Sequence, residues 1–147
     1  MNSPSPRDAA PTALRTTVLG VASVALGYVV FFDLNAWLFS TFKVSDNISW
    51  IFLPAAIRMI AVLLAGWAGV AGLFVGSLAA TAPALVSDPA NALILATLSS
   101  VPSLYAAQTV QRLLDIPHDL RGMTWRHLLC FGLAGGLVNS SVHTGYF

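Results

Sequence analysis

Four strongly polar side chains lie within otherwise apolar stretches of the sequence, and they are the residues best placed to do chemistry. Asp33 and Arg58 each interrupt a long uncharged run, and Asn139 and His143 lie one helical turn apart near the end of the chain. Charged side chains in hydrocarbon are costly, so they normally pair with each other or line a wet cavity. We therefore expect these residues to form either a buried ion pair or a ligand-binding cluster.

The sequence offers no catalytic or metal-binding pattern. It lacks the HExxH, GxSxG, GxxxxGK[ST] and GxGxxG motifs. His118 and His127 have a spacing that fits no compact metal site. The single cysteine, Cys130, permits no internal disulfide and no cysteine-based metal cluster. We expect no catalytic residue, no metal and no cofactor, and hence a protein that is not an enzyme.

The composition indicates that these residues belong to a membrane protein. The chain has 147 residues, of which 56% are hydrophobic and only 9% are charged. A soluble domain carries about 25% charged residues, so this chain has too few to cover a water-facing surface. The net charge of +1 leaves no basic stripe for a phosphate backbone, which argues against a nucleic-acid partner.

Apolar stretches alternate with charged or turn-forming segments, and this alternation predicts where the membrane helices lie. Residues 1–15 are polar and predict a flexible cytoplasmic tail, and residues 16–147 predict one transmembrane domain. A membrane-spanning helix needs about 20 apolar residues. The apolar stretches are residues 16–42, 50–82, 92–111 and 128–147.

The stretch 50–82 is too long for one upright helix and too short for two full ones. Gly66-Trp67 lies at its centre, so we expect a short helical hairpin of helices 51–65 and 69–82. A re-entrant hairpin and a single tilted helix remain open as alternatives. The expected fold is an all-α integral membrane bundle of about five transmembrane helices.

The basic residues predict the orientation of this bundle. Arg7 and Arg15 precede the first span, and residues 112–127 between the fourth and fifth spans contain three further arginines. The opposite side has only Lys43. Because cytoplasmic loops are enriched in Lys and Arg, we expect the N-terminus in the cytoplasm and the C-terminus outside.

Small residues at four-residue spacing predict where the helices approach closely. Ala68, Gly72 and Gly76 share one helical face, and Gly132 and Gly136 repeat the spacing near the C-terminus. Helices in lipid associate through such faces because their backbones can come close together. We favour packing within the chain over a dimer contact, and a homo-oligomer remains possible.

Pro102 lies midway along the fourth span, flanked by Ser99, Ser100 and Ser103. A proline there frees a backbone carbonyl, which the serine hydroxyls could compensate. Pro102 therefore predicts a kink, and alternatively the lining of a cavity.

Part of the sequence resembles a known family. The segment 47–80 resembles the opening of the MASE1 integral-membrane sensory domain at Pro54-Ala55, at Gly66-Trp67 and at residues 74–77 (FVGS). Residues 91–114 are similar to the helix that follows in that family. The chain departs from the pattern at Ala56, where the family prefers glycine, and at Arg58, which adds a charge. The resemblance extends over about residues 17–147, which correspond to the front half of the domain.

The resemblance implies a sensory or interaction module in a bacterial inner membrane. Such domains usually precede a kinase, cyclase or phosphodiesterase, so a membrane or cytoplasmic signalling protein is the implied partner besides the lipid bilayer. The module would bind a small ligand or a membrane partner and signal by helix repacking. Two other functions stay open: a small-solute transport component, such as the substrate-binding subunit of a vitamin transporter, and a structural accessory subunit of a membrane complex.

Overall fold

The computed structural model describes residues 6–39, 43–45, 48–49, 54–116 and 122–146. Side chains are described for residues 14–39, 57–116 and 122–146, with the exception of His143. The described chain is helical apart from one small antiparallel hairpin, in which Lys43 lies opposite Ser49. The elements are α1 (Pro6–Leu38), β1 (Lys43–Ser45), β2 (Ile48–Ser49), α2 (Pro54–Ala80), α3 (Ala82–Ser87), α4 (Pro89–Leu113) and α5 (Trp125–Tyr146).

Three helical segments are long and apolar enough to cross a membrane: Leu14–Leu38, Ile57–Ala80 and Pro89–Leu113. In the first of them only 6% of the most apolar window is buried within the protein. Leu26 and Trp37 are among the large apolar side chains that α1 exposes. A soluble monomer rarely exposes a continuous apolar surface of this extent.

Prolines mark the beginnings of α1, α2 and α4. Pro89 starts α4, and the Asp88 carboxylate accepts a hydrogen bond of 3.1 Å from the backbone N–H of Asn91, which caps the helix. α1 begins at Pro6, so most of the segment that we expected to be a flexible tail is helical. Proline is favoured at the first helical position, and Ala9 and Ala10 follow as strong helix formers.

α2 is broken at Gly66, whose backbone angles are φ 52° and ψ −123°. A β-carbon at Gly69 would collide with the carbonyl oxygen of Ala61. In a straight helix these residues would be about 12 Å apart along the axis, because each residue advances the helix by about 1.5 Å. The second half of α2 therefore folds back against the first half, as expected for a helical hairpin at Gly66-Trp67.

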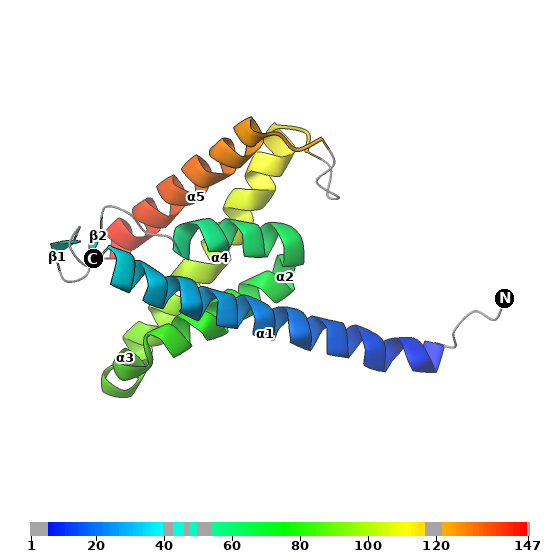
Figure 1. The fold of residues 1–147 in the computed structure, drawn as a ribbon, viewed down its shortest axis with the longest axis horizontal. Helices are drawn as coiled ribbons and strands as arrows, with labels where there is room; N and C mark the ends of the chain where they lie inside the picture. The colour runs from blue at the N-terminus through cyan, green and yellow to red at the C-terminus, as the bar shows by residue number, and fades with distance from the viewer. Residues whose placement is uncertain (1–5, 40–42, 46–47, 50–53, 117–121, 147) are drawn as a thin grey trace.

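The hairpin is the centre of the molecule, because α1, α4 and α5 all pack against α2. α4 and α5 run antiparallel, and at one end Tyr146 Oη donates a hydrogen bond of 2.6 Å to Asn91 Oδ1. In Figure 1 the beginning of α1 and the end of α4 lie toward one side. The β1–β2 hairpin and the end of α5 lie toward the other side.

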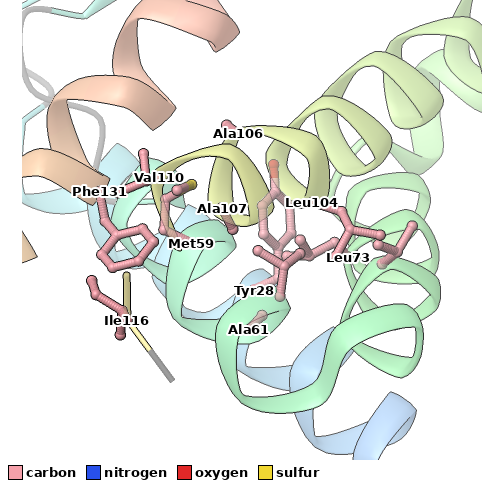
Figure 2. Packing of buried hydrophobic residues seen from close by; sticks show 12 residues of the cluster. Tyr28, Met59, Ala61, Leu73, Leu104, Ala106, Ala107, Val110, Ile116 and Phe131 are labelled. Carbon is pink, nitrogen blue, oxygen red and sulfur yellow. The ribbon is translucent and has the colours of Figure 1, made fainter. Parts of the chain in front are cut away.

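The buried apolar core joins α1, α2, α4, α5 and the start of the α4–α5 connection. Tyr28 from α1 lies close to Leu73 and Leu104 in Figure 2, and Phe131 from α5 lies beside Ile116. The whole cluster comprises Tyr28, Met59, Ala61, Val62, Val70, Leu73, Leu104, Ala106, Ala107, Val110, Ile116 and Phe131.

Glycines allow the second half of α2 to approach α1. A β-carbon at Gly72 would lie 2.6 Å from Val24 Cβ, and one at Gly76 would lie 2.9 Å from the carbonyl oxygen of Ala25. Either distance is too short for a real side chain, so both positions need glycine. Ala68, at the start of the same face, is half-buried.

The expectation for α5 is wrong in detail. A β-carbon at Gly132 or Gly136 would meet no described atom within 4 Å. The close approach occurs instead at Gly135, where a β-carbon would lie 2.7 Å from Met59 Cγ. Four-residue spacing identifies a face of small residues, but it does not tell whether a neighbouring helix covers that face.

α4 continues as one helix through Pro102. The hydroxyls of Ser100 and Ser103 donate hydrogen bonds to backbone carbonyls one turn earlier, at 2.8 Å to Ala96 and 3.1 Å to Ser99. The carbonyl that loses its usual partner at Pro102 is that of Leu98, since the proline lacks an N–H. The serines therefore add hydrogen bonds around the proline, on carbonyls other than the freed one.

Candidate functional site

The site is built around Arg58, which is 4% exposed in the first half of α2. Its Nη1 donates a hydrogen bond of 2.5 Å to Asn139 Oδ1 on α5. Its Nη2 donates one of 2.8 Å to Tyr28 Oη on α1. The guanidinium carbon also lies 5.5 Å from the centre of the Tyr28 ring, close enough for a cation–π attraction. One side chain thus connects three helices, and we call Arg58, Tyr28 and Asn139 the arginine junction.

Close helix contacts position Tyr28 and Asn139 beside Arg58. On one side, a β-carbon at Gly76 would lie 3.0 Å from Tyr28 Cβ, so the missing side chain lets α1 bring Tyr28 against α2. On the other side, the Met59 side chain packs on Gly135. Asn139 is one turn beyond Gly135, so the contact at Met59 holds the amide near Arg58.

Asp33 lies elsewhere, which corrects the expected pairing of Asp33 with Arg58. The Asp33 side chain is exposed. Asp33 follows Tyr28 by five residues. At 3.6 residues per turn, the two side chains therefore leave α1 in directions about 140° apart around the helix axis. The expectation matched the two charges by their depth in the helices, and it had no means to establish which face of α1 meets α2. Tyr28 occupies the place that was expected for Asp33.

His143 lies one turn beyond Asn139 on α5, and its side chain is outside the described residues. Of the four polar residues singled out in the sequence, the described structure brings Arg58 and Asn139 together. The sequence analysis missed Tyr28. A tyrosine inside an apolar helix is itself a signal, because its buried hydroxyl normally finds a hydrogen-bond partner.

A second feature is an open groove of about 510 Å³ between α4 and α5. Its α4 side includes Pro102, Tyr105 and Leu113, so Pro102, for which the lining of a cavity was the alternative to a kink, lies in the wall of a groove. Ala134 and Val138 line the α5 side. The groove is almost entirely apolar, and the hydroxyl of its Thr109 donates a hydrogen bond of 2.8 Å to the Tyr105 carbonyl.

The chemistry available at the arginine junction is binding. A guanidinium forms stronger hydrogen bonds with a carboxylate or phosphate than with the neutral phenol and amide that contact Arg58 here. Among the described residues, no group of three His, Cys, Asp or Glu side chains gathers in a way that could hold a metal ion.

No known protein family, curated protein or solved structure matches the chain.

Proposed function

We propose that the chain is a multi-pass membrane module that senses a small ligand or a membrane partner and responds by repacking its helices. In this proposal α1, the two halves of α2, α4 and α5 form five spans, with the N-terminus in the cytoplasm of a bacterial cell. The resemblance of residues 47–80 to the MASE1 sensory domain favours the same function.

The membrane part of the proposal rests on exposed apolar surface. The exposed side chains of α1 are largely apolar, as are those of α5 at Leu129, Leu133 and Leu137. Such surface is stable against lipid tails and unstable against water. The three helical segments with the length and apolarity of a span support the same conclusion.

The sensory part of the proposed function is based on the arginine junction. Arg58 contacts both α1 and α5 from α2, so the packing of three helices depends on the hydrogen bonds of one side chain. An anionic ligand that reached Arg58 would compete with Tyr28 and Asn139. Loss of either hydrogen bond would loosen one helix contact, and this change in packing is the proposed signal.

The partner proteins provide the test. The full chain is purified in gentle detergent from membranes of the organism that encodes it, and the co-purifying proteins are identified by mass spectrometry. We expect signalling enzymes, and we expect Arg58→Gln to reduce their recovery several-fold. Arg15→Gln, which removes an exposed arginine outside the junction, is the matched control.

Recovery of an ATPase pair in place of signalling enzymes would contradict the sensory proposal and favour a transport component. Equal recovery of signalling enzymes with wild type and with Arg58→Gln would contradict the proposed role of the arginine junction, but not the sensory function of the module. Release of the chain from membranes by an alkaline wash would overturn the membrane proposal itself.

A further inference from the structure

We propose that the groove between α4 and α5 binds an acyl chain of an anionic phospholipid, whose phosphate lies against Arg112 and Arg126. This inference rests on the proposed membrane location of the chain. It does not depend on the arginine junction, which lies outside the groove lining.

The length of the groove selects a lipid chain as its occupant. On α4 the lining runs from Val101 to Leu113, a distance of about 18 Å at about 1.5 Å per residue. One leaflet of a bilayer contributes about half of a hydrocarbon core of about 30 Å. The groove therefore spans the depth of a single leaflet, whereas a partner transmembrane helix would need a surface across both leaflets.

The shape and lining of the groove agree with this occupant. The volume of about 510 Å³ is open along one side, so a chain can enter laterally from the bilayer. Ala134 and Val138 offer small side chains on α5, and Pro102 lies near the deep end on α4. The hydroxyl of Thr109 is used within α4, so the surface offered to the occupant is apolar.

Positive charge lies at the end of the groove where the lipid phosphate would be. Arg112 is exposed in the last turn of α4, next to the lining residue Leu113. It follows Tyr105, another lining residue, by seven residues, so both lie on one face of the helix. Arg126 is in the first turn of α5, with its guanidinium carbon 5.6 Å from the centre of the Trp125 ring.

The surrounding charges leave this end weakly basic. Residues 112–127 contain Arg112, Arg121 and Arg126 against Asp115 and Asp119. In the proposed orientation this end faces the cytoplasm, where the leaflet carries anionic lipids that attract basic segments next to the membrane. Trp125 is suited to the same depth, because its amphipathic ring favours the boundary between headgroups and hydrocarbon.

Lipid retention in native mass spectrometry tests the proposal. The full chain is reconstituted in equal amounts of phosphatidylglycerol and phosphatidylcholine, and the lipids that stay bound on release are counted. Wild type should retain phosphatidylglycerol preferentially. Arg112→Gln and Arg126→Gln should each lower this preference about fivefold, the usual effect of one basic residue near an anionic lipid. Arg15→Gln, an exposed arginine away from the groove, should leave the preference unchanged.

A second pair of variants tests the groove itself. Ala134→Phe should fill it and lower the retention of both lipids, and Leu133→Phe, at an exposed position outside the lining, should not. Because Ala134→Phe could disturb folding, the wild-type chain is also labelled with phosphatidylglycerol that carries a photoreactive group in its acyl chain. We expect labelling at lining residues such as Tyr105 and Leu113.

Even labelling over α1, α4 and α5, or retention that responds equally to Arg112→Gln and Arg15→Gln, would overturn the lipid site. Equal retention of the two lipids by wild type would overturn its preference for anionic lipid. An alkaline wash separates these results from failure of the membrane proposal. A chain that stays in the membrane but shows no preference contradicts only the lipid site, whereas a chain that is washed off contradicts both.

Discussion

Arg58 shows how a charge can be held among apolar helices. The guanidinium is buried, and the neutral hydrogen-bonding groups of Tyr28 and Asn139 satisfy two of its nitrogens. A hydrogen bond to a charged group contributes about 1.5–3 kcal/mol to stability, roughly twice the contribution of a neutral one. Each of the two contacts is therefore a substantial fraction of the margin of stability of a small protein, which is about 5–15 kcal/mol.

We predict opposite outcomes for the two charged residues within the apolar stretches. Arg58→Gln should lower the free energy of unfolding by about 3–6 kcal/mol, because it removes charge-assisted hydrogen bonds to two helices. Asp33→Asn should leave it unchanged or raise it, because the exposed carboxylate lies in the apolar segment of α1, where a charge facing lipid is costly. Thermal unfolding of both variants in the same detergent gives the comparison. Equal destabilisation by the two variants would indicate that Asp33 belongs to the site together with Arg58.

At the scale of elements, single glycines determine how the helices approach one another. Gly72 and Gly76 set the contact of α2 with α1, and Gly135 sets the contact of α5 with α2. Gly66 has a positive φ, a conformation that residues other than glycine adopt with strain. The hairpin and its two neighbours therefore depend on a few positions without side chains.

We predict that glycine-to-alanine substitutions will separate packed positions from open ones. Gly72→Ala should destabilise the fold by about 1–3 kcal/mol, because the added methyl overlaps Val24. Gly132→Ala should be neutral or stabilising by up to about 1 kcal/mol, since alanine favours a helix and has open space here. Unfolding temperatures and yields in detergent measure both effects. Destabilisation by Gly132→Ala would show that another surface covers this face.

The hairpin in α2 predicts the side on which each connection lies. A reporter that fluoresces only in the cytoplasm should be bright when fused after Ile116 and dark when fused after Ser87 or Phe147. The reason is that a hairpin crosses twice, so α4 begins on the outside and returns to the cytoplasmic side. A bright fusion after Phe147 would contradict the five-span arrangement.

At the scale of the molecule, the sequence was sufficient for the helical class and for the break in α2. Long apolar stretches and Gly66-Trp67 carry that information locally, because length and backbone conformation depend on neighbouring residues. The start of α1 was placed too late, since Pro6 and the following alanines favour helix despite the polar composition. The three segments with the properties of a span agree with part of the predicted bundle.

The site was only partly predictable, because it depends on which helix faces touch. Arg58 and Asn139 were identified as polar residues within apolar runs, and the structure brings them together. Tyr28 was missed and Asp33 was included, since depth along a helix can be read from the sequence and rotation about its axis cannot. Gly132 and Gly136 were misplaced for the same reason, three residues and one residue away from the contact at Gly135.

A double-mutant cycle on Arg58 and Asn139 tests whether these two residues of the arginine junction interact. Arg58→Gln, Asn139→Leu and the double variant are compared with wild type by unfolding in lipid nanodiscs. The sum of the two single effects should exceed the effect of the double variant by about 1.5–3 kcal/mol, because both single substitutions remove the same hydrogen bond. The matched cycle of Arg58→Gln with Asp33→Asn should be additive. Additivity within about 0.5 kcal/mol for Arg58 and Asn139, the usual result for independent sites, would contradict the junction.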